Sequence, residues 1–373
     1  MRYSQLLQDI PRTRRDDRLQ APWGLGTADC TPVAPPGTLL SELPLGRRRT
    51  ADVNRWRGEV RAVLDGADDR LLVIAGPCSV HDPAAAREYA RWLAGVAARI
   101  SGDVLLVMRA YFEKPRTAAG WRGLTTDPGL DGSCDIGLGL REARQVLLSI
   151  ADAGVPAATE WVDLLDPLYL GDAVTWSAVG ARTVESPGHR LLASALPMPV
   201  AFKNGTGGSK KAAVNACVVG SAGQDFKSVS PVGGLVHVTS PGNPDCHVVL
   251  RGGDDGPNHT AAHVEEALAL LAEAGLPQRV LVDASHGNSG KDYRRQPAVA
   301  EVVAAQVAAG QRGIAGVMLE GFFEAGRQEP GDLATLTYGQ SVTDECMDTG
   351  MTLGVLDSLA AAARARRGAR GYR

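Results

Sequence analysis

Residues 104–117 read VLLVMRAYFEKPRT, an apolar run that passes directly into a segment with three cations, Arg109, Lys114 and Arg116. The apolar run predicts a buried strand, and KPRT predicts a loop, since Pro115 has no amide hydrogen to donate. Cations at the carboxyl end of a strand suit an anionic ligand, because Arg presents a planar fork and Lys a point charge to phosphate or carboxylate. If the pattern stood alone, a solvated basic loop would be the simpler interpretation.

The pattern does not stand alone, because short apolar runs alternate with helical stretches from Leu71 onward. The runs that we expect to form strands are 71–75, 104–108, 156–161, 178–182, 199–203, 247–250, 279–283 and 313–320. Such alternation predicts parallel βαβ units. Eight units in one domain of this size favour an α/β fold of the (β/α)8 TIM barrel type over an open sheet.

Three segments depart from this alternation. Residues 1–45 are rich in Arg, Pro and Gly and predict an N-terminal extension, an interface or regulatory arm, before a catalytic barrel domain at 46–373. Residues 50–64 are expected to form an amphipathic helix with Thr50 as its N-cap. Residues 225–239, ahead of the sixth strand, hold two strand-like stretches around a Pro-Val-Gly-Gly turn and predict an inserted β-hairpin.

Composition narrows the class of protein. The 373 residues are 44% hydrophobic, which suffices for a sizeable core. The formal net charge of -3 argues against nucleic acid as a partner, so the cations must serve a local site. No apolar run approaches the roughly 20 residues that span a bilayer, so we expect no membrane role. Six cysteines without C-x-x-C spacing, and no secretory signal, favour a cytoplasmic protein with reduced thiols.

Barrel enzymes carry their active sites at the carboxyl ends of the strands, and the strand ends here are unusually polar. The cations among them are Arg109, Lys114, Arg116, Arg182, Lys203 and Arg251. Six cations that converge on one mouth repel one another unless an anion lies between them. The sequence therefore predicts a pocket for two anionic groups, at least one of them a phosphate.

A second set of residues at or beyond the strand ends has the chemistry of metal ligands. Its members are Cys78, His286, Glu320 and Asp344. Thiolate, imidazole and carboxylate together suit a divalent transition metal. Their spacing is not a local motif, so two other interpretations stay open: Cys78 as a small buried hydrophobe, and His286 as a histidine hydrogen-bonded in a turn.

Seven local strings carry a family resemblance. They are GPCSVHD at 76–82, RAYFEKPRT at 109–117 with Gly120-Trp121, GARTVES at 180–186, FKNGT at 202–206, LRGG at 250–253, DASHGNS at 283–289 and YGQSVTD at 338–344. In combination they resemble the type I 3-deoxy-D-arabino-heptulosonate-7-phosphate (DAHP) synthases, the first enzymes of the shikimate pathway and of aromatic amino acid biosynthesis. The likeness extends over most of the chain.

The resemblance implies a reaction, the condensation of phosphoenolpyruvate with erythrose 4-phosphate, and a divalent metal (Mn, Co or Fe) on the four residues named above. The residues implied for phosphoenolpyruvate are Arg109, Lys114, Glu160, Gly180, Ala181, Arg182, Lys203 and Arg251. Those implied for erythrose 4-phosphate are Lys114, Pro115, Arg116, Thr117 and Asp283. Lys114 and His286 are implied as the catalytic groups that move protons.

The resemblance also implies a homodimer or homotetramer and an aromatic amino acid as effector. The chain departs from the common pattern in its longer arm, at Ala284 and Gly287, and in the hairpin turn, which leaves the effector open. Two other hypotheses remain. One is a paralogous condensing enzyme of specialised metabolism that uses a modified tetrose phosphate, and the other is a non-catalytic subunit that binds an effector.

Overall fold

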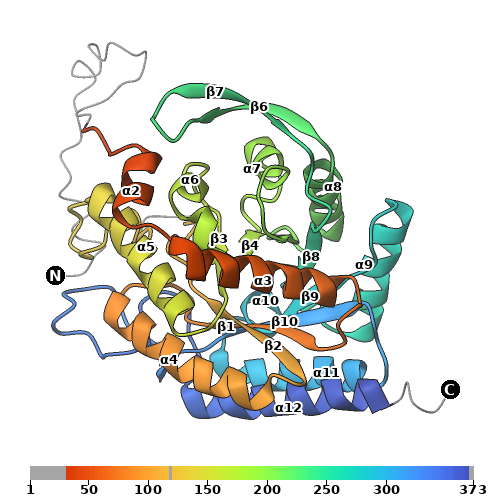
Figure 1. The fold of residues 1–373 in the computed structure, drawn as a ribbon. Helices are drawn as coiled ribbons and strands as arrows, with labels where there is room; N and C mark the ends of the chain where they lie inside the picture. The colour runs from red at the N-terminus through yellow and green to blue at the C-terminus, as the bar shows by residue number, and fades with distance from the viewer. Residues whose placement is uncertain (1–30, 117–119, 369–373) are drawn as a thin grey trace.

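The computed structural model describes residues 31–116 and 120–368, and its centre is a closed barrel of parallel strands (Figure 1). The strands of the barrel are β1 (Leu71–Gly76), β2 (Val104–Arg109), β3 (Ala157–Glu160), β4 (Trp176–Val179), β5 (Val200–Lys203), β8 (His247–Leu250), β9 (Val280–Asp283) and β10 (Ile314–Glu320). The barrel closes where β1 pairs with β10, with Gly76 opposite Glu320. The predicted (β/α)8 TIM barrel is confirmed.

Helices surround the barrel (Figure 1). They are α4 (Pro83–Ile100), α5 (Ile136–Asp152), α6 (Asp166–Leu170), α7 (Pro187–Ala193), α8 (Lys210–Ser221), α9 (Ala261–Glu273), α11 (Gln296–Ala308) and α12 (Thr349–Gly368). The start of α4 shows how the sequence encodes them: the Asp82 carboxylate accepts hydrogen bonds from the N–H groups of Ala84 and Ala85. Pro83 takes the first helical position, where no N–H is needed.

The barrel wall separates two apolar layers, because successive residues of a strand point to opposite faces. On β1, Leu72 and Ile74 belong to the group of buried residues inside the barrel. Leu71 and Val73 belong to the larger group that packs between strands and helices. The strands are buried on both faces, which explains why they read as continuous apolar runs in the sequence.

Helix α3 (Gly46–Leu64) runs across the N-terminal end of the barrel in Figure 1 and closes it. Its Val63 packs with the residues inside the barrel. The helix begins at Gly46, so the prediction that Thr50 caps it is wrong: the Thr50 hydroxyl donates to the Gly46 carbonyl inside the helix. Leu45, just before the helix, is buried, and its burial anchors the additional turn.

The fourth strand lies earlier than predicted, at Trp176–Val179 instead of 178–182. The strand ends before Gly180, where the Glu160 side chain of the neighbouring strand lies close to the backbone. A Cβ at Gly180 would lie 2.2 Å from Oε1 of Glu160, so this position has no room for a side chain. Ser177 interrupts the apolar run in the sequence and hid the true beginning of the strand. The correction places Arg182 in the loop after the strand, at the mouth of the barrel.

The predicted hairpin is confirmed as β6 (Gln224–Val229) and β7 (Leu235–Ser240), which pair antiparallel and arch over one side of the barrel (Figure 1). Helix α2 (Pro36–Glu42) is the described part of the predicted extension. The Gly37 N–H donates to the Pro231 carbonyl at the hairpin turn, at 2.7 Å. Residues 1–30 of the predicted arm lie outside the described residues, and the domain boundary at 45/46 stays a prediction.

Sequence reasoning missed the structure that follows β10. There β11 (Glu324–Arg327) and β12 (Gln340–Ser341) form a small parallel sheet, and backbone bonds join Gly326 to Cys346 in both directions. This folding brings the chain back to the barrel mouth just before Asp344. The remaining short helices are α10 (His286–Ser289) and two 3-10 turns, Gly171–Ala173 and Tyr293–Arg295.

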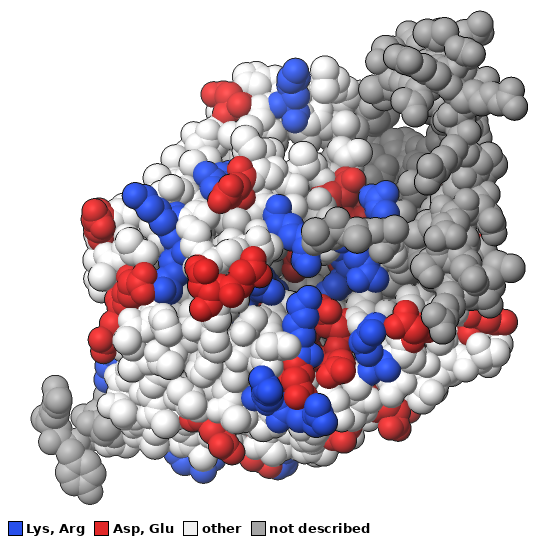
Figure 2. Space-filling view, turned by 180° about the vertical axis from the view of Figure 1, so that it is seen from behind, with Lys and Arg blue, Asp and Glu red and all other residues white. Residues whose placement is uncertain are grey.

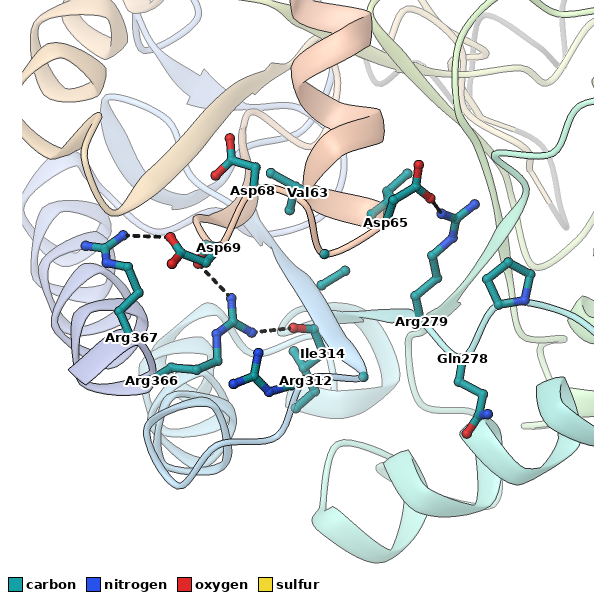
Figure 3. Close-up of a pocket in the computed structure, with 15 residues that line it drawn as sticks. Val63, Asp65, Asp68, Asp69, Gln278, Arg279, Arg312, Ile314, Arg366 and Arg367 are labelled. Atoms are coloured by element: carbon teal, nitrogen blue, oxygen red, sulfur yellow. Dashed lines mark hydrogen bonds and ion pairs between the residues drawn. The ribbon is translucent and has the colours of Figure 1, made fainter. Parts of the chain in front are cut away.

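The N-terminal end of the barrel holds a hollow of about 460 Å³ beside the end of α3 (Figure 3). Arg279 forms an ion pair with Asp65, and Arg366 of α12 donates to the Ile314 carbonyl at 3.0 Å. In β/α barrels this end contributes to stability, whereas chemistry takes place at the opposite end. None of the described helices is both long and apolar enough to cross a membrane.

Candidate active site

The carboxyl ends of the strands meet in a hollow of about 290 Å³, which we call the mouth. The residues that line it are Lys114, Pro115, Arg116, Glu160, Ala181, Arg182, Lys203, Arg251, His286, Lys291 and Asp344. Figure 2 views the molecule from the side opposite to Figure 1 and shows Lys and Arg near the centre of this face with Asp and Glu among them. The lining therefore carries six cations and two carboxylates beside one histidine.

Beneath the mouth lies a group of metal-ligand donors. Cys78, Glu320 and Asp344 each offer one ligand atom, and these atoms lie within 4.8 Å of one another. His286 adjoins the group, with Nε2 at 3.6 Å from Oε1 of Glu320. Its Nδ1 lies 2.8 Å from Oδ2 of Asp283, an arrangement that fixes the ring of a metal-binding histidine. Sulfur, nitrogen and carboxylate oxygen at these positions fit a divalent transition metal.

The electrostatics of this group favour a bound cation. Burial, and after it the Glu320 carboxylate, raise the pKa of the Cys78 thiol to about 12. Burial alone would raise the pKa of Glu320, but His286 and Arg109 hold it below its usual value. Against burial, Lys114 and His286 likewise lower the pKa of Asp344. Two carboxylates thus stay charged beside a thiol, and a metal ion bound here would supply the positive charge that favours the thiolate form of Cys78.

Arg109 lies under the mouth and is fully buried. It donates to Oε1 of Glu320 at 2.8 Å and to the carbonyls of Pro77 and Cys78 at 3.1 Å each. Its guanidinium carbon lies 3.6 Å from the ring centre of Tyr111, a cation–π contact. The Arg109 guanidinium therefore binds the side chain of one predicted metal ligand, Glu320, and the backbone carbonyl of another, Cys78.

Lys203 links three strands at one wall of the mouth. Its ammonium lies 3.3 Å from Oδ2 of Asp283 and 3.9 Å from Oε2 of Glu160. All three side chains are buried, and a buried charge needs such partners. Because parallel strands end at the same edge of the barrel, β3, β5 and β9 bring together residues that are far apart in the sequence.

The loop after β2 contributes two further cations to the mouth, Lys114 and Arg116. The Lys114 ammonium lies 2.9 Å from Sγ of Cys78 and 4.0 Å from Oδ2 of Asp344. The backbone of this loop is fixed by the bond from the Lys114 N–H to the Arg122 carbonyl, at 2.8 Å. Arg116 Nε donates to the Trp121 carbonyl at 2.9 Å, which holds the side chain at the rim.

The turn after β9 presents His286 in a strained conformation. Its φ of +53° is unusual for a residue other than glycine, and such strain is often found at functional sites. Asn288 stabilises the turn, since its side-chain amide donates to the carbonyls of Leu250 and Asp283 at the ends of two strands. The sequence pattern Asp-Ala-Ser-His-Gly-Asn-Ser thus contains both the predicted ligand and the residue that stabilises its turn.

The predicted site residues fall into three groups. Most of them line the mouth, and Gly180 lies directly beside this lining. Cys78, Arg109, Asp283 and Glu320 are fully buried. Polar contacts join Cys78, Asp283 and Glu320 to residues of the lining, and Arg109 is bonded to Glu320 and to the Cys78 carbonyl. Thr117 lies outside the described residues. Sequence reasoning missed Lys291, because it follows the seventh strand of the barrel by eight residues and does not lie at the strand end.

Comparisons with known proteins agree with this geometry. A family model described as the DAHP synthetase I family matches residues 48–356. The chain belongs to the DAHP synthetase I family. It is 46% identical over 336 residues to the Phe-sensitive phospho-2-dehydro-3-deoxyheptonate aldolase of Escherichia coli (strain K12), which covers 90% of this chain and 96% of that relative. The Tyr-sensitive enzyme of the same organism is 47% identical over 318 residues, with 85% and 89% covered.

Among solved structures, the phospho-2-dehydro-3-deoxyheptonate aldolase of Francisella tularensis SCHU S4 is similar, with a TM-score of 0.89 and 41% identity. The match covers 91% of this chain and 99% of that chain. Membership in the DAHP synthetase I family confirms the predicted enzyme class, a DAHP synthase of aromatic biosynthesis. The roles of individual site residues stay predictions.

Proposed function

We propose that the mouth condenses phosphoenolpyruvate with erythrose 4-phosphate, giving DAHP and inorganic phosphate. The observation that supports this most strongly is the position of six cations directly above the Cys78, Glu320 and Asp344 donors. A carbon–carbon bond forms between the enol methylene carbon and the aldehyde carbon. Water adds at the former enol carbon, and phosphate leaves. Both substrates are anions, so their approach requires fixed positive charge.

The wall made by Arg182, Lys203 and Arg251 suits phosphoenolpyruvate. Its phosphate and carboxylate need several donors, and guanidinium groups bind both bidentately. Ion pairs with Glu160 and Asp283 hold the Lys203 ammonium in its place in this wall. Gly180 and Ala181 supply backbone at the rim without a bulky side chain. Arg109 supports the wall from below.

The loop with Lys114, Pro115 and Arg116 suits erythrose 4-phosphate, and we assign Arg116 to its phosphate together with Thr117. Asp283 completes the set implied for this substrate. The Lys114 ammonium lies beside Sγ of Cys78, close enough to the metal donors to give a proton to an oxygen held there. His286, bordering both the donor group and the mouth, is the second proposed proton-transfer group.

The metal that these residues would hold supplies Lewis acidity toward the aldehyde oxygen. We infer Mn, Co or Fe as divalent ions, because the mixed sulfur, nitrogen and oxygen set suits transition metals better than Mg or Ca. Chelation should abolish activity, and Mn should restore it. A chelated enzyme that keeps its full activity would contradict metal dependence.

The decisive experiment measures phosphate release from phosphoenolpyruvate with and without erythrose 4-phosphate, in the presence of Mn. We expect release only when both substrates are present. Release that needs an aminated tetrose phosphate instead would favour the paralogue of specialised metabolism. No release with any aldose phosphate would favour the non-catalytic subunit.

The remaining expectations belong to the same proposal: a cytoplasmic homodimer or homotetramer that an aromatic amino acid inhibits. The names Phe-sensitive and Tyr-sensitive of two similar relatives support the effector. Light scattering and inhibition by phenylalanine and tyrosine test the assembly and the effector separately.

A further inference from the structure

A second hollow, of about 420 Å³, adjoins the mouth on the side of the loops that follow β8 and β9. Arg251, His286 and Lys291 line both hollows, so the two spaces meet across these side chains. Arg295, from the 3-10 turn, lines the second hollow and is absent from the lining of the mouth. We call the second hollow the side pocket.

The side pocket is positively charged. Arg251, Lys291 and Arg295 line it, against the single carboxylate of Asp254. The acid nearest to Arg295 is Asp292, at 3.7 Å from Nε, and Asp292 lies closer to Arg294, at 2.9 Å. No hydrogen bond or ion pair joins the Lys291 ammonium to another part of the chain that the structure describes. The cations that line the side pocket thus outnumber its one carboxylate, and the acids that act on Lys291 and Arg295, Asp344 and Asp292, lie outside its lining.

The floor of the side pocket is backbone that only glycine can form. A Cβ at Gly287 would lie 2.7 Å from the backbone nitrogen of Gly253, so the two loops pack main chain against main chain. Gly252, at φ +71°, also lies against the Gly287 backbone: a Cβ added at Gly252 would lie 2.4 Å from the Gly287 carbonyl carbon. Gly253 and Gly287 both line the side pocket, so backbone without a side chain borders the hollow at these two positions.

The backbone conformation of Lys291 supports a functional placement. Its φ is +64°, in the left-handed region, which costs a lysine roughly 1 kcal/mol relative to glycine. The Lys291 N–H donates to the His286 carbonyl at 2.8 Å, so this strained residue closes the turn that begins with the predicted metal ligand. Because unfavourable backbone conformations are often kept at functional sites, the left-handed conformation of Lys291 suggests that its side chain is needed at the border of the two hollows.

We propose that the side pocket is a subsite for inorganic phosphate, which passes through it when it leaves the mouth. The proposal rests on the proposed function. The reaction releases phosphate at the wall that contains Arg251, and a dianion held by several cations there would leave slowly. Because Arg251 and Lys291 border both hollows, phosphate can exchange contacts with the mouth for contacts with Arg295 one at a time. The phosphate of the aldose is the competing occupant.

Substitution of Arg295 separates these possibilities, because this residue does not line the mouth. For Arg295→Gln we expect the inhibition constant of inorganic phosphate, measured as product inhibition with Mn present, to rise about threefold, as an exposed charged contact is worth little. The KM values of both substrates should change less than twofold. Arg294→Gln is the matched control, since Arg294 is the adjacent exposed arginine and lies outside the lining. It should leave the inhibition constant unchanged.

Lys291→Met provides an independent measurement at the border of the two hollows. We expect a rise of roughly tenfold in the inhibition constant of phosphate, larger than for Arg295→Gln because the charge adjoins both hollows. Inhibition constants like that of the unmodified enzyme in both variants would overturn the subsite. A selective increase of the KM for erythrose 4-phosphate in Arg295→Gln would assign the pocket to the aldose phosphate and also overturn it. An enzyme without any phosphate release would instead refute the proposed function.

Discussion

Arg116 is the residue that most clearly distinguishes two phosphate positions in the mouth. It lies in the loop after β2, and its only described side-chain bond, to the Trp121 carbonyl, leaves the terminal nitrogens of its guanidinium without a described partner. For Arg116→Ala we expect a rise of roughly 30- to 150-fold in the KM for erythrose 4-phosphate, because a charge-assisted contact is worth about 2 to 3 kcal/mol. The KM for phosphoenolpyruvate should change much less.

Arg122→Ala is the control for this variant, since Arg122 belongs to the same loop but does not line the mouth. Steady-state kinetics with each substrate varied in turn would measure both effects. Equal increases in the two KM values would remove the assignment of separate phosphate positions.

Cys78 carries the metal prediction. It follows Gly76 and Pro77 at the end of β1 and is fully buried, with Sγ at 3.6 Å from Oδ2 of Asp344. Ser is close to Cys in volume, but its hydroxyl stays protonated at neutral pH and supplies no anionic ligand, so Cys78→Ser should lose bound Mn and most activity while keeping its fold. Metal content by mass spectrometry and circular dichroism measure the two properties.

Cys217→Ser places the same change at a buried position remote from the donor group. This control should keep its metal and its activity. Normal Mn-dependent turnover by folded Cys78→Ser would support the other interpretation of this cysteine, a small hydrophobe in the core.

Residues at strand ends could be predicted from the sequence because barrel geometry gathers them wherever the strands lie. Lys291 could not be assigned in this way. It follows the end of β9 by eight positions, and its place in the mouth depends on α10 and on a left-handed turn. Thr50 failed as an N-cap for another reason: the burial of Leu45 and the pairing of Arg49 with Asp152 extend the helix beyond the best local cap.

At the scale of elements, β4 and β8 carry a buried polar pair inside the barrel. The Trp176 indole N–H donates to Nε2 of His247 at 3.1 Å, and Nδ1 of His247 lies 2.8 Å from the Asp245 carbonyl. Burial, and after it the charge of Arg279, lower the pKa of His247 to about 3. The imidazole is therefore neutral in the folded protein at neutral pH.

This depressed pKa makes folding sensitive to acid. Between about pH 6.5 and 3 the unfolded chain binds a proton at His247 that the folded chain does not. The contribution of His247 to the free energy of unfolding is therefore fully present above pH 6.5 and is lost as the pH is lowered. The contribution of His247 should have a slope of at most about 1.4 kcal/mol per pH unit. In urea unfolding at several pH values, His247→Gln should lose stability less steeply than the unmodified protein.

His237→Gln, on the exposed hairpin, is the control and should keep the slope of the unmodified protein. Parallel pH profiles for His247→Gln and the unmodified protein would refute the assignment.

The arm and the hairpin form a second pair of coupled elements. Gly37 of α2 lies so close to the hairpin turn that a Cβ would meet the Pro231 carbonyl oxygen at 2.7 Å. Gly37→Ala should therefore displace α2 from the hairpin, whereas Gly58→Ala in α3 meets no atom within 4 Å and should be neutral or stabilising. We expect Gly37→Ala to weaken assembly and inhibition by aromatic amino acids with unchanged KM values.

Light scattering and inhibition curves test this expectation. Identical mass and inhibition for Gly37→Ala and the unmodified enzyme would show that the contact serves neither property. The hairpin itself could be predicted from its turn and alternating strands, but its contact with α2 could not. That contact joins segments almost two hundred residues apart through one backbone bond, for which sequence patterns carry no signal.

At the scale of the whole molecule, the eight strands were predictable because each is buried on both faces and reads as an apolar run. The small β11–β12 sheet was not, since its strands are short and mostly exposed or half-buried. Yet this sheet returns Asp344 to the mouth. The barrel thus has one end that carries the predicted site residues and an opposite end, crossed by α3, where ion pairs and hydrogen bonds join the ends of α3 and α12 to the barrel (Figures 1 and 3).

The separation of the two ends predicts that stability and activity can be changed independently. Arg366 of α12 is buried, and it donates to the carbonyls of Ile314, Asp69 and Arg70 at 3.0 to 3.4 Å. Arg366→Ala removes the donor of the buried Ile314 carbonyl and of two partly buried carbonyls, which should cost roughly 2 to 4 kcal/mol of unfolding free energy. Because the residue lies at the end opposite to the mouth, kcat/KM at 25 °C should stay within twofold.

Arg364→Ala is the matched control, because Arg364 belongs to the same helix but is exposed and forms an ion pair with Asp103. Its loss should cost less than about 1 kcal/mol. Thermal and urea unfolding, with kinetics on the same samples, measure both properties. A tenfold change in the KM of either substrate in Arg366→Ala would show that the two ends are coupled through the barrel, and unchanged stability would show that α12 is not held by this residue.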